Sequence, residues 1–191
     1  MVAGLILAAG GGTRFGPEPK LLSQLKGRPL LEHAIRAQCG VPELERIVVV
    51  LGAYADRLIA AVNFMRAEPV VCEAWSEGQA ASLRRGVEEL RDAERVIVTL
   101  GDEPLITSET VARFVSAPPG SQAVYDGRPG HPVVLGSEHL RALLTLTGDR
   151  GARDLLADGP KIELGGPGDA GRDVDTTEDL ERMRNEARAN V

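Results

Sequence analysis

The sequence has few cysteines and few aromatic residues. Its 191 residues include two cysteines, Cys39 and Cys72, and Phe, Trp and Tyr together make up 3%. The two cysteines match no metal-ligand spacing, which argues against a cysteine-based zinc site. Both stand in apolar surroundings, so we expect buried free thiols in a protein of the reducing cytoplasm.

Long apolar runs and an excess of positive charge are also missing. No apolar stretch approaches the ~20 residues of a membrane span. The formal net charge is −6 and the pI is near 5.2. Nucleic acids and anionic membranes usually select a basic face, so neither is expected as a partner. Met1 leads into an apolar run and not into a basic segment, which favours a cytoplasmic protein without a secretory signal.

Apolar runs alternate with segments of helical periodicity. We expect buried strands over 2–9, 46–52, 68–74 and 94–102, and a further strand over 161–164. Helices are expected over 29–39, 53–65, 80–90, 107–116, 137–144, 152–157 and 176–189. The stretch 121–136 differs, because two short apolar runs flank a Gly/Pro-rich turn, which predicts an antiparallel hairpin.

This order of elements predicts an α/β fold. We expect a single domain over 1–191 with three layers (α/β/α), a mostly parallel sheet and a β-hairpin insertion. The hydrophobic fraction of 43% in 191 residues is enough for one domain with a real core. Ligands of such sheets bind beyond the carboxyl ends of the strands. The unusual residues of this sequence follow those ends.

The first expected strand ends in glycines, and two cations follow. "LAAGGGTRFGPEPK" (7–20) holds three glycines at 10–12, then Arg14 and Lys20. Glycines let backbone N–H groups approach a polyanion, while Arg and Lys bind phosphate oxygens. This pattern favours a phosphate site. The alternative is a tight turn with two solvated cations.

Two standard phosphate motifs do not fit this loop. The dinucleotide fingerprint G-x-G-x-x-G requires a third glycine where Phe15 stands. The P-loop requires a lysine after Gly16, where Pro17 stands.

The loop resembles the signature L-A-A-G-x-S-x-R-M-G-x(2,3)-K-x-L of nucleotidyltransferases with a GT-A-like fold. Further segments resemble that family in order: "GRPLLEHAIR", "WSEGQAASLRRGV" (75–87), "GDEPLIT" (101–107), "GRPGHPVVL" (127–135), "GDRGARDLL" (148–156) and "DVDTTEDL" (173–180). The G-H-P and G-D-x-G-A-R segments are similar to the molybdenum cofactor cytidylyltransferase branch (MobA/MocA-like). Related guanylyltransferases usually open L-A-G-G, where this chain has Ala9.

The sequence departs from the family pattern at a few positions. Gly12 replaces a serine, Phe15 and Glu103 replace methionines, and Thr177 replaces a proline. The stretch 79–81 lacks the serine-rich form. Every charged signature residue is retained, but Gly12 and 79–81 leave the nucleotide preference open.

The resemblance implies a Mg²⁺-dependent transfer of CMP from CTP to the phosphate of molybdopterin, with release of pyrophosphate. Catalytic roles fall to Arg14, Lys20 and Asp102. Nucleotide binding is expected at Leu7, Ala8, Ala9, Gly10, Gly11, Gly12, Arg14, Lys20, Gly52, Gly78 and Ser82. Trp75 could pack near the nucleotide, although a lone Trp after a strand is more often part of a core.

The metal is expected on Asp102 and Asp175, because Mg²⁺ takes one or two carboxylates together with substrate phosphates. Asp102 ends the fourth strand, and Asp175 precedes the helix start at Thr176. Each has a structural alternative, as an Asx turn or as part of a helix start. Asp173 is an alternative second ligand.

The acceptor is expected at Gly130, His131 and Pro132. Pro132 stiffens the hairpin, Gly130 is expected to adopt a turn conformation that is costly for other residues, and His131 can donate to a phosphate or stack on a pterin. The alternative is a histidine that bonds only the local backbone.

Other functions stay open at this point. The same core suits guanylyl or sugar-nucleotide transfer, and a non-catalytic molybdenum cofactor carrier or maturation chaperone is a different class. The presence of Arg14, Lys20, Asp102 and Asp175 disfavours the carrier. A molybdenum hydroxylase is a possible client, and neither the client nor the oligomeric state follows from the sequence.

Overall fold

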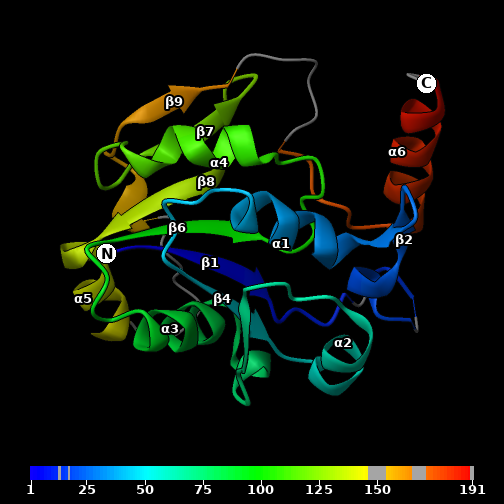
Figure 1. The fold of residues 1–191 in the computed structure, drawn as a ribbon, viewed down its shortest axis with the longest axis horizontal. Coiled ribbons are helices and arrows are strands. Elements are labelled where there is room, and N and C mark those ends of the chain that lie inside the picture. The colour runs from blue at the N-terminus through cyan, green and yellow to red at the C-terminus, as the bar shows by residue number, and fades with distance from the viewer. Residues whose placement is uncertain (13, 17, 146–153, 165–170, 190–191) are drawn as a thin grey trace.

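A seven-stranded sheet forms the centre of the computed structural model, which describes residues 1–12, 14–16, 18–145, 154–164 and 171–189 (Figure 1). Its strand order is β5-β4-β1-β6-β8-β7-β9. The strands are β1 (Val2–Ala8), β4 (Arg46–Leu51), β5 (Glu68–Val71), β6 (Arg95–Leu100), β7 (Gln122–Tyr125), β8 (Arg128–Gly136) and β9 (Lys161–Glu163). A separate hairpin pairs β2 (Gln24–Leu25) with β3 (Arg28–Pro29).

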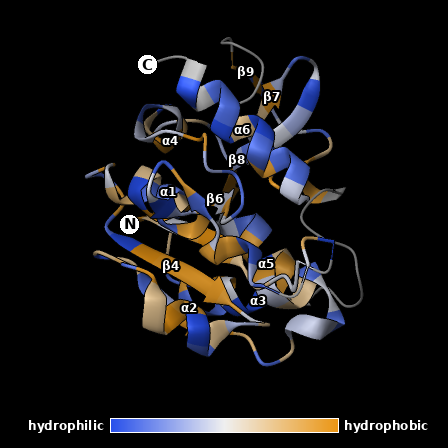
Figure 2. Ribbon diagram, turned by 90° about the vertical axis from the view of Figure 1, so that its right-hand side faces the viewer, coloured by the Kyte–Doolittle hydropathy of each residue, from blue (hydrophilic) through white to orange (hydrophobic). Residues whose placement is uncertain are grey.

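The strands β5, β4, β1 and β6 run parallel. β4 has the sequence RIVVVL and is buried along almost its whole length, which is why Figure 2 shows it as a nearly continuous hydrophobic strand. β-Branched residues covered on both faces are typical of a parallel sheet. The four predicted parallel strands are therefore confirmed.

The predicted hairpin is confirmed, but it extends the sheet instead of standing apart from it. β8 pairs antiparallel with both β6 and β7, and β9 then adds parallel to β7. Its turn is Asp126–Gly127, where both residues have positive φ, as a two-residue hairpin turn requires. The expectation of a turn at Gly130 is wrong, because Gly130 lies within β8.

The helices are α1 (Leu30–Cys39), α2 (Ala55–Ala61), α3 (Gln79–Glu89), α4 (Ser108–Val115), α5 (Ser137–Thr145) and α6 (Thr177–Ala189). Short 3₁₀ turns occupy Lys20–Leu22, Trp75–Glu77 and Asp154–Leu156. α2 is shorter than predicted, because the Asn63 side chain accepts the Met65 N–H and forms a turn instead of another helical turn. The helix expected over 152–157 and the segment 148–156 lie partly outside the described residues.

Two buried clusters place helices on both faces of the sheet, which confirms the three-layer arrangement (Figure 1). α1, α2 and α4 share the cluster that contains Ile35, Leu58 and Phe114. α3 and α5 share the other cluster, which contains Val87 and Leu140. None of the helices in the described part of the chain has the length and apolar character needed to cross a bilayer.

A third, smaller cluster joins α6 to the glycine-rich loop and to the β2–β3 hairpin. We call it the α6 cluster; its buried members are Phe15, Leu25, Leu30, Val174, Leu180 and Met183. Arg184 of α6 also donates two hydrogen bonds to the carbonyl of Gln24. These contacts hold the C-terminal segment against the loop that follows β1.

Candidate active site

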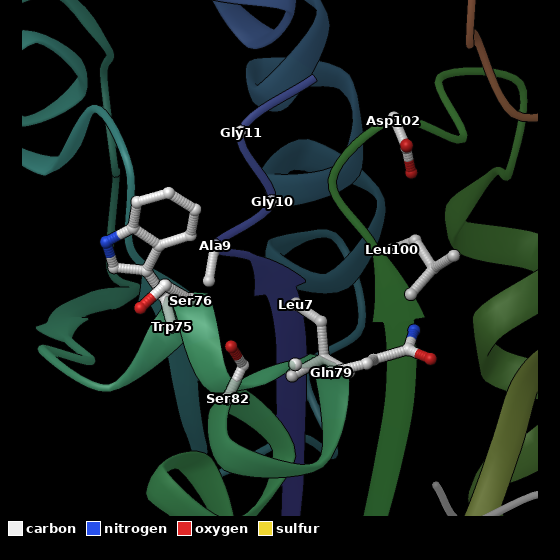
Figure 3. A pocket seen from close by; sticks show the side chains of 11 residues that line it. Leu7, Ala9, Gly10, Gly11, Trp75, Ser76, Gln79, Ser82, Leu100 and Asp102 are labelled. Atoms are coloured by element: carbon white, nitrogen blue, oxygen red, sulfur yellow. The ribbon is translucent and has the colours of Figure 1, made fainter. Parts of the chain in front are cut away.

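A cavity of about 360 Å³ opens beyond the carboxyl ends of β1 and β6 (Figure 3). Its lining comes from the end of β1 and the loop after it, from the 3₁₀ turn Trp75–Glu77 and the start of α3, and from the end of β6 and the loop after it. The lining residues are Leu7, Ala9, Gly10, Gly11, Trp75, Ser76, Gly78, Gln79, Ser82, Leu100 and Asp102. The start of α3 directs backbone N–H groups and a positive helix dipole toward this space, which suits an anion.

Most of the nucleotide-binding residues predicted from the sequence line this cavity. Leu7, Ala9, Gly10, Gly11, Gly78 and Ser82 do so, and Asp102 joins them. Ala8, Gly12, Arg14, Lys20 and Gly52 are not part of the lining. Gly52 lies behind it, where a Cβ would stand 2.5 Å from the Ala9 carbonyl oxygen and 2.6 Å from the Trp75 Cβ. A side chain at position 52 would therefore push the loop and the Trp75 segment apart.

Sequence reasoning missed three lining residues: Ser76, Gln79 and Leu100. Trp75, for which the sequence left open a place near the nucleotide or in a core, also lines the cavity, and its ring lies against Gly11, 3.5 Å from where a Cβ on that glycine would stand. Gln79 opens α3 and extends across the cavity (Figure 3). The signal for both was the W-x-E-G segment, whose spacing places a tryptophan and the first helical residue at one loop.

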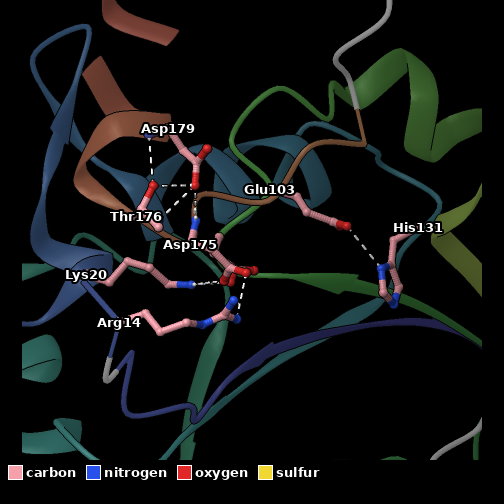
Figure 4. A network of polar contacts seen from close by, with 8 residues as sticks. Arg14, Lys20, Glu103, His131, Asp175, Thr176 and Asp179 are labelled. Atoms are coloured by element: carbon pink, nitrogen blue, oxygen red, sulfur yellow. Dashed lines mark hydrogen bonds and ion pairs between the residues drawn. The ribbon is translucent and has the colours of Figure 1, made fainter. Parts of the chain in front are cut away.

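A cluster of alternating charges lies beside the cavity (Figure 4). Lys20 Nζ is 2.6 Å from Asp102 Oδ2 and 3.4 Å from Asp175 Oδ1, and Arg14 Nη2 is 2.7 Å from Asp175 Oδ2. The Lys20 side chain is 11% exposed, whereas that of Arg14 is 72% exposed. The structure thus brings together four of the predicted site residues, from segments far apart in the sequence.

The backbone explains how Asp175 reaches Asp102. The Val174 N–H donates to the Asp102 carbonyl at 3.0 Å, and the Val174 side chain is buried in the α6 cluster. Thr176 then caps α6: its Oγ1 accepts the Asp179 N–H, and Asp179 Oδ2 accepts the Thr176 N–H. These two reciprocal hydrogen bonds form a capping box at the start of α6. The hydrogen bonds from Thr176 hold the pKa of Asp179 below its usual value.

Three carboxylates, those of Asp102, Asp173 and Asp175, lie near one another beside the cavity. Partial desolvation and the charges of Asp175 and Asp102 raise the pKa of Asp173. Asp175 makes direct ion pairs, so it stands closer to the cation position than Asp173 does. The ammonium of Lys20 lies between Asp102 and Asp175, which shows that this space favours a cation.

Within the described ranges, no three His, Cys, Asp or Glu side chains are arranged to hold a metal ion. A divalent ion here would rest on Asp102 and Asp175 and would take its remaining ligands from substrate phosphates and water. That donor set is usual for Mg²⁺, so the residues present fit the ion.

The predicted acceptor residues lie on β8. His131 Nδ1 is 3.1 Å from Glu103 Oε1, and the His131 side chain is 23% exposed. Burial disfavours the protonated ring, but the charge of Glu103 and its hydrogen bond outweigh burial, so the pKa of His131 lies above its usual value. Pro132 is buried, and Gly130 gives room to Tyr125, whose ring would be 3.0 Å from a Cβ at that position.

Comparison with known proteins gives one family and several relatives. A family model described as the MobA-like NTP transferase domain matches residues 4–163. The nicotine blue oxidoreductase of Paenarthrobacter nicotinovorans is 36% identical over 196 residues, which cover 95% of this chain and 96% of that protein. The bifunctional protein GlmU of Cereibacter sphaeroides is 35% identical over 144 residues, 70% of this chain. The match spans 32% of GlmU, about a third of its length.

Solved structures share the fold. Rv0371c of Mycobacterium tuberculosis H37Rv superposes with a TM-score of 0.85 at 26% identity, covering 96% of this chain and 97% of that one. The complex of Rv0371c with manganese superposes with a TM-score of 0.79 at 25% identity, covering 96% of this chain and 98% of that one. A nucleotidyl transferase from Methanothermobacter superposes with a TM-score of 0.83 at 22% identity, covering 100% of this chain and 99% of that one.

Proposed function

The chain belongs to the MobA-like NTP transferase family, and from this premise we propose that it transfers CMP from CTP to the phosphate of a molybdopterin-type acceptor. A phosphate oxygen of the acceptor forms a bond to the α-phosphorus of CTP, and the bond from that phosphorus to the leaving pyrophosphate breaks. The observation that carries the proposal is the Lys20–Asp102–Asp175 cluster at the mouth of a glycine-lined cavity.

The residues have separate tasks in this reaction. Backbone N–H groups of the 10–12 loop and of the start of α3 bind the triphosphate, and Lys20 and Arg14 compensate its charge. Reactants and transition state are anionic throughout, so positioning and charge compensation supply most of the catalysis.

A divalent ion, Mg²⁺ by our proposal, would be held by Asp102 and Asp175. It would neutralise phosphate charge and polarise the phosphoryl oxygens of the nucleotide. The manganese complex of Rv0371c supports a divalent ion at this fold. When the ion and the nucleotide bind, Lys20 can turn from the two aspartates to the phosphates.

The test of the reaction is pyrophosphate release from each of the four NTPs, with purified molybdopterin as acceptor and with Mg²⁺ or Mn²⁺. We expect release that depends on both acceptor and metal. A protein that binds molybdopterin without turnover would be a carrier. Turnover with a sugar phosphate in place of molybdopterin would move the function to sugar-nucleotide transfer.

We expect CTP to exceed GTP in kcat/KM by about 10²-fold or more, because base selection rests on hydrogen bonds to the base edge. The motivation is Ala9 at the cavity wall, where guanylyltransferases usually carry glycine. Initial rates at varied CTP and GTP give the ratio. Comparable values for the two nucleotides would contradict the choice of CTP and leave nucleotidyl transfer intact.

Replacing His131 by alanine should raise the KM for the acceptor about tenfold, which corresponds to ~1.4 kcal/mol. The affinity for CTP without acceptor should stay within about twofold, because His131 lies on β8, outside the cavity lining. His139→Gln, in α5 just after the far end of β8, is the control. A lost CTP affinity would move His131 to the nucleotide side, and no effect on either substrate would return it to a structural role.

A second candidate follows from the relative named nicotine blue oxidoreductase, because its similarity extends over 95% of this chain. An oxidoreductase acting on nicotine blue would exchange electrons with a redox partner and would consume no NTP. Decolorisation of nicotine blue with a reduced nicotinamide or flavin, measured in wild type and in Asp102→Asn, separates the two functions. Only nucleotidyl transfer requires the Asp102 carboxylate for a metal.

A further inference from the structure

Glu103 is a buried carboxylate next to the charge cluster. It follows Asp102 after the end of β6, and the residue is 3% exposed. Its Oε1 lies 3.1 Å from Nδ1 of His131. Its Oε2 is buried and has no hydrogen-bond partner within the part of the chain that the structure describes.

Fold stability alone gives no reason for this carboxylate. A buried carboxylate with an unpaired oxygen costs free energy, and an apolar residue of similar size often fills such a site equally well or better. We therefore look for a function of this carboxylate in its contact with His131, to which it is hydrogen-bonded.

His131 is held from two directions. Tyr125 Oη donates to the His131 carbonyl oxygen at 2.6 Å, and the Tyr125 ring packs against Gly130, so the backbone is fixed. Figure 4 shows the ring with Nδ1 toward Glu103 and the opposite edge turned away from it. When Nδ1–H donates to Glu103, the free nitrogen is Nε2.

We infer that Glu103 is a positioning residue: by accepting the Nδ1–H of His131 it fixes the ring and presents Nε2 to the phosphate of the acceptor. The identity of that acceptor rests on the proposed function, whereas the state of the ring does not. A protonated Nε2 donates to a phosphate oxygen, and a neutral Nε2 accepts from a protonated one. Either way, contact with the acceptor requires the ring orientation that Glu103 sets.

The ring orientation is testable without any substrate. The chain has three histidines, so imidazole ¹⁵N signals of the apo protein can be assigned by comparison with His131→Ala. At alkaline pH we expect His131 of the wild type to carry its proton on Nδ1. In Glu103→Met this Nδ1–H form should be lost. An unchanged tautomer in Glu103→Met would overturn the inference, even if the enzyme transfers nucleotides.

Kinetics test the consequence. Glu103→Met should raise the KM for the acceptor about tenfold, with kcat and the KM for CTP within about twofold. Glu103→Gln should raise the KM for the acceptor by less, because its amide oxygen can still accept the Nδ1–H of His131. The double variant with His131→Ala should be no worse than His131→Ala alone, since the two residues act as a unit. Glu109→Gln, an exposed glutamate of α4, is the control.

A structural role predicts a different pattern. The Glu103→Met variant would then unfold at a lower denaturant concentration, and the KM values for both substrates would change together. We expect its unfolding free energy to be unchanged or higher. Additive losses in the double variant would overturn the inference. Absence of nucleotidyl transfer in the wild type would overturn the proposed function and leave the ¹⁵N result to decide the ring orientation.

Discussion

Replacing Asp102 by asparagine is expected to abolish metal-dependent pyrophosphate release while the fold stays intact. The asparagine side chain has the same shape but lacks the charge that holds a divalent ion between Asp102 and Asp175. We expect kcat/KM to fall by at least about 10³, the upper range for one lost transition-state charge contact. Titration with Mg²⁺ and with Mn²⁺ at saturating CTP measures the loss.

The fold should tolerate this change. The Asp102 side chain is 20% exposed, and Lys20 keeps Asp175 as a partner at 3.4 Å. We expect the free energy of unfolding to change by no more than about 1 kcal/mol. Asp92→Asn, an exposed aspartate before β6 at the opposite end of the sheet, is the control. Near-normal metal-dependent activity in Asp102→Asn would mean that the metal sits elsewhere.

Replacing Lys20 by alanine should lower kcat/KM by about 10²–10³, and Arg14→Ala should do the same, since each removes one cation from the triphosphate site. The two variants should differ in the apo protein. Lys20 is largely buried between two carboxylates, whereas Arg14 is exposed. Loss of Lys20 therefore removes a positive charge that compensates the negative charges of Asp102, Asp173 and Asp175.

The sign of the accompanying pKa change can be measured. The charge of Lys20 lowers the pKa of Asp173, against the larger effects that raise it. In Lys20→Ala the pKa of Asp173 should rise further, as followed by NMR titration of its carboxyl carbon. Lys26→Ala, in the β2–β3 turn, is the matched control for a lysine of the same region. An unchanged Asp173 and unchanged kinetics would remove Lys20 from the site.

Local patterns predicted most of the fold. The run RIVVVL at 46–51 can be recognised as a buried strand, and Thr176 with Asp179 as a helix start, because the signal lies within a few residues. The β2–β3 hairpin was missed, since its strands have two residues each and no period. The place of the 121–136 hairpin in the sheet depends on pairing of β8 with β6, which no local pattern encodes.

The candidate site was predictable as a set of residues and less so as an arrangement. Glycines, cations and aspartates follow strand ends, and those ends meet at one edge of a parallel sheet. Asp173 and Asp175 stand two positions apart just before the start of α6, so the sequence could not choose between them. The pairing of Glu103 with His131 joins the loop after β6 to β8 through a tertiary contact, and only the structure places their side chains together.

The ion pairs of the site join residues that are 82, 155 and 161 positions apart. Such contacts close long loops of the chain, and the entropic cost of forming them early in folding is large. On a ribosome, the glycine-rich loop and β6 are made well before Asp175 and α6. A nascent chain therefore cannot complete the charge cluster until Asp175, which lies just before α6, has been synthesised.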